Sequence, residues 1–249
     1  MRLSDRVAIV TGAARGIGSA IAMGFAAAGA AVVVNYSRSE AEAEEVVRRI
    51  SLEGGKAIPV QADVSDLQSH ERLVHAALDH FGRLDILVNN AGIEFREPFL
   101  DASPASWDLT FAVNLRGVYF LSQAAARAML TFGGGKILNI SSIHDDVPIR
   151  NLSIYSITKG GMKMLTKSLA FELAEHKINV NSLSPGAILT DINREALSDP
   201  AYRARVIEKI PWKRIGEVGD VVGAAVFLCS SGSDYVTGAT LYVDGGILL

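Results

Sequence analysis

Residues 6–18 read RVAIVTGAARGIG, a short apolar run followed by three closely spaced glycines. The run predicts a buried strand, and apolar residues at helical spacing from Gly16 onward predict a helix. Glycine is required where the backbone takes a positive φ or approaches a ligand, and a helix N-terminus attracts a pyrophosphate. A lone glycine pattern is also typical of tight helix–strand packing. The order of strand, glycine turn and helix favours a dinucleotide-binding α/β fold.

Apolar runs and helical patterns alternate along the rest of the chain. The other predicted strands cover residues 31–35, 56–61, 84–88, 136–140, 178–183 and 239–243. Because crossovers between parallel strands are right-handed, this alternation predicts one Rossmann-type, doubly wound sheet of seven parallel strands with helices on both faces. We expect residues 1–249 to form a single domain, with a polar insert at about 190–211 that covers the substrate.

The composition is that of a compact globular protein, with 49% hydrophobic and 20% charged residues. The formal charge of -3 comes without a basic stripe, which argues against nucleic acid or an anionic membrane as partner. Cys229 is the only cysteine, so neither an intrachain disulfide nor a thiolate metal site is expected. The N-terminus lacks a signal-peptide pattern, and no apolar run reaches about 18 residues. We expect a cytoplasmic protein that binds small molecules and copies of itself.

A candidate acid/base pair lies in a long predicted helix. Tyr155 and Lys159 are four residues apart, so their side chains project from one face. An ammonium near a phenol favours the phenolate and lowers a pKa that starts at about 10. Ser142 follows the strand at 136–140, where its hydroxyl can bind a carbonyl or alcohol oxygen. Taken alone, this spacing is also typical of an ordinary amphipathic helix face. Other motifs must therefore show whether the pair is catalytic.

Further motifs stand at specific places in the chain. They are TGAARGIG at 11–18, NNAG at 89–92, Asn114, Ser142, Tyr155, Lys159 and Pro185-Gly186. This highly specific set resembles the short-chain dehydrogenase/reductase family, and the resemblance covers the whole chain. It implies the strand order 3-2-1-4-5-6-7 and reversible hydride transfer between C4 of a nicotinamide and an alcohol carbon.

The resemblance also assigns catalytic roles. Tyr155 exchanges the hydroxyl proton, while Lys159 lowers the pKa of Tyr155 and holds the nicotinamide ribose. Ser142 positions the substrate oxygen, and Asn114 holds a water that links the lysine to solvent. A buried structural amide is the alternative interpretation of Asn114.

The expected cofactor site follows the carboxyl ends of the strands. By resemblance, Asp63 contacts the adenine amino group, although it is also a plausible turn residue, and Ile188 and Thr190 contact the nicotinamide carboxamide. The full expected set is Thr11, Gly12, Arg15, Gly16, Ile17, Gly18, Ser37, Arg38, Asp63, Val64, Asn90, Ala91, Gly92, Tyr155, Lys159, Pro185, Gly186, Ile188 and Thr190.

NADP is the preferred cofactor. The second predicted strand runs into Asn35-Tyr36-Ser37-Arg38, with no acidic residue to accept from a ribose 2′-hydroxyl. Ser37, Arg38 and Arg15 offer a hydroxyl and two guanidinium groups to a 2′-phosphate. Both arginines are alternatively ordinary solvated surface, and dual-specificity members of the family leave NAD open as a second cofactor.

Local segments such as SSIHDDVP at 141–148 and VTGATLYVDGG at 236–246 resemble the bacterial glucose dehydrogenases of this family. The resemblance implies oxidation of β-D-glucose, with Glu94, His144 and Asn193 at sugar hydroxyls beside Ser142 and Tyr155. The plain alternatives are a surface charge, a loop histidine and a helix cap. The sequence departs from those enzymes at Ser37, where they carry an arginine, and at Ile149-Arg150, where they carry an aromatic residue and a proline.

Two other functions and one assembly state follow from the same residues. A 3-oxoacyl-carrier-protein reductase or another NADPH-dependent ketoreductase uses the same machinery, but residues 129–132 and Phe171 lack the charge that an acidic carrier protein favours. A silent dinucleotide-binding regulator is disfavoured by the intact catalytic set. Apolar outer faces at 124–130 and 162–173 predict a homo-oligomer, and the family resemblance implies a homotetramer.

Overall fold

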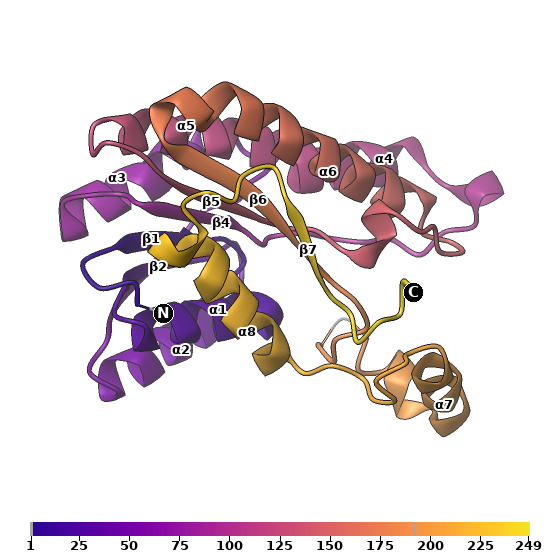
Figure 1. The fold of residues 1–249 in the computed structure, drawn as a ribbon. Helices are drawn as coiled ribbons and strands as arrows, with labels where there is room; N and C mark the ends of the chain where they lie inside the picture. Colours follow the sequence, from indigo (N-terminus) through magenta and orange to yellow (C-terminus); the bar gives the residue numbers. More distant parts are fainter. Residues whose placement is uncertain (1, 192) are drawn as a thin grey trace.

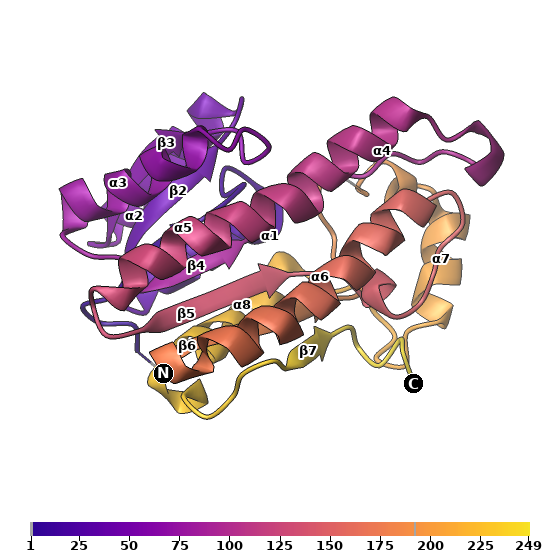
Figure 2. The ribbon, with the colours of Figure 1, turned by 90° about the horizontal axis from the view of Figure 1, so that it is seen from above.

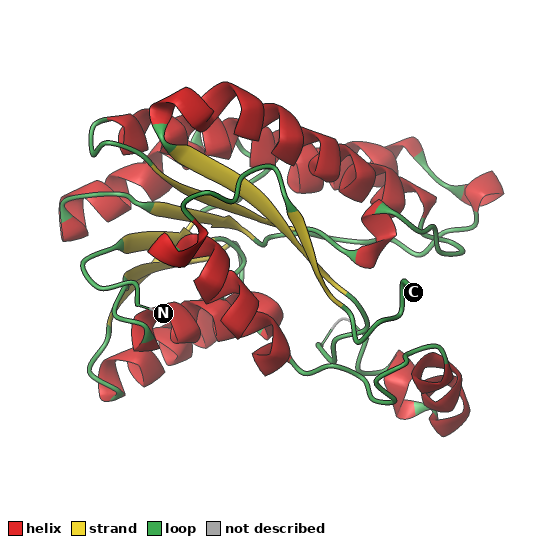
Figure 3. Cartoon of the chain, viewed as in Figure 1, coloured by secondary structure: helices red, strands yellow, loops and turns green. Residues whose placement is uncertain are grey.

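The structure is a computed structural model and describes residues 2–191 and 193–249. Its centre is a seven-stranded parallel sheet in the order β3-β2-β1-β4-β5-β6-β7, as the sequence predicts. The strands are β1 Val7–Val10, β2 Ala31–Tyr36, β3 Lys56–Gln61, β4 Ile86–Asn89, β5 Gly135–Ile140, β6 Ile178–Pro185 and β7 Thr240–Val243. Helices cover both faces of this sheet (Figures 1 and 3).

The two helical layers pack on opposite faces of the strands. One layer contains α1 Gly16–Ala27, α2 Glu40–Leu52 and α8 Val218–Cys229; the other contains α3 Ser69–Phe81, α4 Pro104–Phe111, α5 Val118–Leu130 and α6 Ser153–Leu173. Successive residues of a strand point to opposite faces. Ala8 and Val10 accordingly pack in the first core, whereas Val7 and Ile9 pack in the second. None of the helices within the described ranges is long and apolar enough to cross a membrane.

Helices α4 and α5 join through a π-helix, Ala112–Gly117, and form one continuous rod (Figure 2). Ser103 caps α4 by accepting a hydrogen bond from the backbone N–H of Ser106, and Pro104 occupies the first helical turn. A side chain at Gly117 would collide with the carbonyl oxygen of Val64. The rod therefore packs directly on the turn after β3.

The segment that the sequence presents as a polar insert is folded. It contains a 3₁₀ turn, Ala196–Ser198, and the helix α7, Pro200–Glu208, which Asp199 caps at its N-terminus. Leu197, Ile210 and Ile215 are buried together in a small apolar cluster. Ile192, within the predicted insert, lies outside the described residues.

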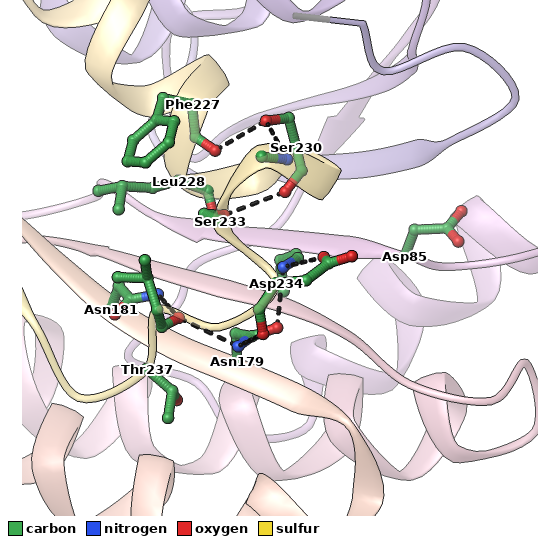
Figure 4. A network of polar contacts seen from close by, with 12 residues as sticks. Asp85, Asn179, Asn181, Phe227, Leu228, Ser230, Ser233, Asp234 and Thr237 are labelled. Atoms are coloured by element: carbon green, nitrogen blue, oxygen red, sulfur yellow. Dashed lines mark hydrogen bonds and ion pairs between the residues drawn. The ribbon is translucent and has the colours of Figure 1, made fainter.

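A polar network fixes the loop before β7 at the amino end of β6 (Figure 4). Asn179 and Asn181 both donate side-chain hydrogen bonds to the carbonyl oxygen of Val236. Lys136 Nζ lies 2.8 Å from Asn179 Oδ1 and 2.7 Å from Asp234 Oδ1. These contacts hold β7 at the edge of the sheet, with its carboxyl end on the side where open α/β sheets bind ligands.

Candidate active site

The turn after β1 is tied to the end of β4 by a buried hydroxyl. Thr11 Oγ1 accepts hydrogen bonds from the backbone N–H groups of Asn90, at 2.9 Å, and Ala91, at 3.0 Å. It donates to the carbonyl oxygen of Val88. The amide of Asn90 returns two hydrogen bonds, to the carbonyl oxygens of Thr11 and Gly12. The structure therefore joins the first and second sequence motifs into one unit.

Glycine is required at specific points of this unit. Gly12 and Gly16 both have a φ of 59°, a conformation that side-chain-bearing residues rarely adopt. A Cβ at Gly18 would collide with the Asn90 amide. No side chain among residues 2–191 and 193–249 caps the α1 N-terminus, whose first N–H groups are therefore free to bind a phosphate. The turn fits a pyrophosphate.

Asn35 organises the turn in a way that the sequence did not indicate. Its Oδ1 accepts from the backbone N–H of Gly12 at 3.1 Å, and its Nδ2 donates to the carbonyl oxygens of Val60 and Ala62. The side chain is buried and links the glycine turn to the ends of β2 and β3. A polar amide directly after the apolar run of β2 was the available signal, since a buried amide must find partners.

The residues expected at the adenosine end lie along the same edge of the sheet. Arg15, Ser37 and Arg38 are all exposed, and each follows a strand of this edge. An exposed hydroxyl and two exposed guanidinium groups fit a phosphate. Tyr36 donates its hydroxyl to Glu40 Oε1 at 2.9 Å, which ties the acidic first turn of α2 to the strand end.

Asp63 and Val64 form the turn after β3. Asp63 Oδ1 accepts hydrogen bonds from the backbone N–H and the hydroxyl of Ser65. Val64 is buried, and His70 Nε2 lies 2.9 Å from its carbonyl oxygen. The contacts of Asp63 are those of a turn residue, which was the alternative interpretation, and its expected contact with adenine stays a prediction.

The catalytic candidates converge beyond the carboxyl ends of β4 and β5. Tyr155 and Lys159 share one face of α6, and Lys159 Nζ lies 5.4 Å from the centroid of the Tyr155 ring. Lys159 is buried and donates to the carbonyl oxygen of Ile140 at 2.9 Å. Ser142 begins a 3₁₀ turn, Ile143–Asp145, and hydrogen-bonds Tyr155.

The electrostatics of this pair differ from the sequence prediction. Burial raises the pKa of Tyr155 above its ordinary range; the hydrogen bond from Ser142 opposes this, and the carboxylates of Glu94 and Asp145 add to it. Burial also lowers the pKa of Lys159 to about 8, although the carboxylates of Asp145 and Glu94 act to raise it. The prediction that the pKa of Tyr155 is lowered is therefore wrong for the free protein, because burial is the largest influence and raises this pKa. Tyr155 keeps its proton at neutral pH.

Asn114 lies in the π-helix, where its amide joins three segments. Its Oδ1 accepts from the backbone N–H of Ile93, and its Nδ2 donates to the carbonyl oxygen of Ile93 and to Thr158 Oγ1. A Cβ at Gly92 would lie 3.4 Å from Asn114 Oδ1 and 3.9 Å from Lys159 Nζ. A π-helix at a functional residue is a recurrent feature of proteins. The structure brings Asn114 to Lys159, and its role in a water relay stays a prediction.

The segment after β6 closes one side of the site. Pro185 ends β6, and Gly186 packs so closely on Asp244 that a Cβ would lie 2.7 Å from its Cα. Ile188 is buried, and Thr190 Cγ2 lies 3.9 Å from the position of a Cβ on Gly16. Thr190 therefore lies close to the glycine turn, and the expected contact of Ile188 and Thr190 with the nicotinamide carboxamide stays a prediction.

Of the three residues expected at a sugar, the structure brings His144 into contact with Tyr155, and the Glu94 carboxylate acts on Tyr155 electrostatically. The His144 and Tyr155 rings meet edge to face with centroids 6.4 Å apart. Glu94 is largely buried, pairs with Arg96 at 3.2 Å, and acts electrostatically on Tyr155. Asn193 instead accepts from the backbone N–H of Thr190 and donates to a carbonyl oxygen of its own loop. Its amide braces its own loop and caps neither of the next two helical segments, because Glu195 and Asp199 precede them; its expected contact with a sugar stays a prediction.

Comparison with known proteins gives the same family. A family model described as enoyl-(acyl carrier protein) reductase matches residues 12–248. L-Rhamnose 1-dehydrogenase (NAD(P)(+)) of Azotobacter vinelandii is 46% identical, covering 100% of this chain and 99% of that protein. 3β-Hydroxysteroid dehydrogenase 1 of Eggerthella lenta is 43% identical over 99% and 95% of the two chains. Glucose 1-dehydrogenase 2 of Bacillus subtilis is 41% identical over 99% and 96%.

A solved structure agrees with these relatives. The gluconate 5-dehydrogenase of Burkholderia cenocepacia, in complex with NADP and tartrate, superposes with a TM-score of 0.94 at 40% identity, covering 99% of this chain and 96% of that one. The glycine turn, the Tyr155–Lys159 pair, the strand order and these likenesses together show that the chain belongs to the short-chain dehydrogenase/reductase family of NAD(P)-dependent oxidoreductases.

Proposed function

We propose that this oxidoreductase oxidises the C1 hydroxyl of an aldose, with β-D-glucose as the leading substrate and NADP as the preferred cofactor. The observation that carries the proposal is the edge-to-face contact of His144 with Tyr155, together with the electrostatic effect of the Glu94 carboxylate on Tyr155. A carboxylate and an imidazole beside the reacting hydroxyl can bind the other hydroxyls of a sugar. Relatives named for rhamnose and glucose support the same substrate class.

The chemistry divides between the cofactor and the chain. When bound, the nicotinamide accepts the hydride from the alcohol carbon. The hydroxyl proton passes to the phenolate of Tyr155, and the carbonyl product stays hydrogen-bonded to Ser142. In the reverse direction the neutral phenol, favoured by burial, donates that proton to the carbonyl oxygen. The buried ammonium of Lys159 stabilises the phenolate when it forms.

The preference for NADP rests on charge at the adenosine end. Arg15 and Arg38 are exposed, and the end of β2 at residues 35–38 carries no acidic residue that would bind a ribose hydroxyl. The NADP named with the related gluconate dehydrogenase supports this choice. NAD remains a second cofactor in the proposal, in keeping with the NAD(P)(+) of the rhamnose relative.

Reduction of a 3-oxoacyl thioester is the second candidate. It is favoured by the family model that matches the chain, which is described by an acyl-carrier-protein reductase. The uncharged, exposed side chains of Leu130, Phe132 and Phe171 argue against an acidic carrier protein as the partner.

The same exposed side chains support assembly into a homotetramer. Leu130 on α5 and Met164 and Phe171 on α6 are large, apolar and open to solvent in the isolated chain, with Phe171 88% exposed. Apolar side chains gathered on helix faces mark surfaces that another copy of the chain can cover.

The sugar pocket is tested with Glu94→Gln and His144→Phe. The first removes the charge at constant size, and the second keeps an aromatic ring against Tyr155. Both should raise KM for the sugar about tenfold while leaving KM for a simple secondary alcohol nearly unchanged. Any effect on the pKa of Tyr155 is common to both substrates, so the ratio of the two KM changes isolates sugar binding. Equal changes would exclude these residues from the sugar pocket.

A further inference from the structure

The carboxylate of Asp145 is held by two strands of the sheet. Ser184 Oγ donates to Asp145 Oδ2 at 2.7 Å, and the Tyr242 hydroxyl donates to Asp145 Oδ1 at 3.0 Å. Ser184 lies on β6 and Tyr242 on β7, whereas Asp145 ends the 3₁₀ turn that Ser142 begins. The turn that carries the substrate-positioning hydroxyl is therefore anchored to the sheet through Asp145.

The network continues to the helix that carries the acid/base pair. Tyr242 also accepts a hydrogen bond from Lys163 Nζ at 3.0 Å. Lys163 is four residues beyond Lys159, so Tyr155, Lys159 and Lys163 lie on one face of α6. Two hydroxyls thus bind the Asp145 carboxylate, and the Lys163 ammonium binds one of these hydroxyls. The backbone oxygen of Asp145 lies 3.9 Å from the position of a Cβ on Gly160, the residue after Lys159, so the turn packs directly on α6.

We propose that Asp145 is a positioning residue for hydride transfer, which fixes the turn bearing Ser142 and places a negative charge beside Tyr155 and Lys159. The inference rests on the proposed alcohol oxidoreductase function and deepens it. A nearby carboxylate makes loss of a proton less favourable for both groups. Asp145 accordingly keeps Lys159 an ammonium and holds Tyr155 as a neutral phenol until the substrate is in place.

Asp145 is one of several charged or polar groups that act on Tyr155 and Lys159. Glu94 acts on Tyr155 and Lys159 in the same direction as Asp145, and the hydrogen bond from Ser142 acts on Tyr155 in the opposite direction. Around Asp145 itself lie Tyr242, Lys163, His144 and the neighbouring Asp146. Asp146 points its carboxylate to Lys163, at 3.2 Å, and is largely exposed. Asp145 and Asp146 are thus adjacent carboxylates with different partners, and each serves as a control for the other.

Asp145→Asn tests the charge, with Asp146→Asn as the matched control. The readout is the pH dependence of kcat/KM for alcohol oxidation. Removing the Asp145 charge should shift the midpoint to lower pH by about half a unit or more. Asp146→Asn should leave the midpoint in place, and Asp145→Glu should restore it. A loss of kcat and thermal stability in Asp145→Asn with no change in the midpoint would show a purely structural role and overturn the proposal.

Variants that keep the negative charge at position 145 test whether its hydrogen bonds to the sheet matter. Tyr242→Phe removes one donor to the carboxylate, so kcat should fall several-fold while the midpoint moves less than in Asp145→Asn. If Asp145→Asn does not fold, Tyr242→Phe and Asp145→Glu still test the proposal. An unchanged kcat in Tyr242→Phe, or a midpoint shifted to lower pH in Asp145→Glu, would contradict the proposal.

A measurement without substrate separates this inference from the proposed function. In protein labelled with ¹³C-lysine, the Cε resonance of Lys159, assigned with Lys159→Arg, reports the pKa of that ammonium. The pKa should be lower in Asp145→Asn than in the parent protein, and unchanged in Asp146→Asn. If the parent protein oxidises no alcohol, the proposed function fails; if the Lys159 titration is the same with and without the Asp145 charge, this inference fails.

Discussion

The ammonium of Lys159 lies 5.4 Å from the centre of the Tyr155 ring and donates a hydrogen bond to the carbonyl oxygen of Ile140. The lysine is thus anchored to the end of β5 and not to the phenol. In this geometry Lys159 is a fixed charge that can stabilise a phenolate when one forms, while it leaves the hydroxyl of Tyr155 to exchange a proton with the substrate.

Replacing Tyr155 by phenylalanine should remove turnover and spare the cofactor. Loss of a positioned acid/base lowers rates by about 10²–10⁴-fold. The ring and its contacts with Lys159 and His144 remain, so the affinity for NADPH should stay nearly the same. Initial rates and a fluorescence titration of NADPH measure the two quantities. Activity close to that of the parent protein would identify another residue as the acid/base.

The rate of alcohol oxidation should rise with pH well above neutrality. Burial raises the pKa of Tyr155, so the phenolate that accepts the hydroxyl proton is scarce at pH 7 and becomes more abundant as the pH increases. A profile of kcat/KM measured under conditions of constant ionic strength checks this. A plateau already reached at pH 7 would contradict the direction of the pKa shift.

Arg15 and Arg38 should together determine the preference for NADP. Replacing either by alanine should raise KM for NADP about tenfold and leave KM for NAD nearly unchanged, because only NADP carries the 2′-phosphate. Arg48→Ala is the control, since Arg48 is an exposed arginine on α2 paired with Glu45. Equal effects on both cofactors would place the two arginines away from the phosphate.

The fold and much of the site could be predicted from the sequence. Strands such as Val7–Val10 are apolar on both faces and are followed by glycine turns, which leaves few arrangements other than a parallel sheet between two helical layers. Tyr155 and Lys159 are four residues apart on a helix, so local periodicity alone brings them together.

Features that depend on distant contacts could not be predicted. The π-helix around Asn114 packs through Gly117 against Val64, a residue far away in the chain, so local sequence did not indicate it. The burial that reverses the predicted pKa shift of Tyr155 is likewise a tertiary property. The polar pattern near Asn193 predicted either a sugar contact or a helix cap, and the hydrogen bonds of its amide to its own loop depend on a backbone conformation that the pattern did not reveal.

Asp85 should make a large contribution to stability. Burial alone would raise its pKa, but hydrogen bonds from Arg83, Arg6 and the backbone N–H of Val7 hold the pKa of this carboxyl below its ordinary value. Asp85→Asn should lower the free energy of unfolding by about 2 kcal/mol, because the charge-assisted hydrogen bonds from Arg6 and Arg83 are lost while both arginines remain partly solvated. Urea unfolding at pH 7 measures this.

The same carboxylate predicts a pH dependence of stability. Since its pKa is lower in the folded state, its contribution is complete above the unfolded value of about 3.9 and is lost as the pH falls through the folded pKa. The difference in stability between the parent protein and Asp85→Asn should therefore shrink below about pH 4. Glu45→Gln, which removes an exposed pair with Arg48, is the control and should leave the free energy of unfolding nearly unchanged, because water screens that pair. Equal losses in the two variants would contradict the account.

Assembly should be visible in the mass of the particle. Light scattering at micromolar concentration should give the mass of four chains of 26.5 kDa each. Phe171→Asp places a charge on an exposed apolar helix face and should shift the population toward smaller species. A monomeric mass for the parent protein would refute the proposed homotetramer.

Initial-rate formation of reduced cofactor from β-D-glucose tests the central claim most directly. NADP and NAD are compared in parallel, with L-rhamnose, galactose, xylose and a simple secondary alcohol as alternative substrates, and Tyr155→Phe as the inactive control. We predict rapid reduction of NADP with an aldose, fastest with glucose, slower reduction with the simple alcohol, and none in the variant. No reduction with any sugar, together with oxidation of NADPH by acetoacetyl thioesters, would contradict the sugar dehydrogenase and establish the ketoreductase in its place.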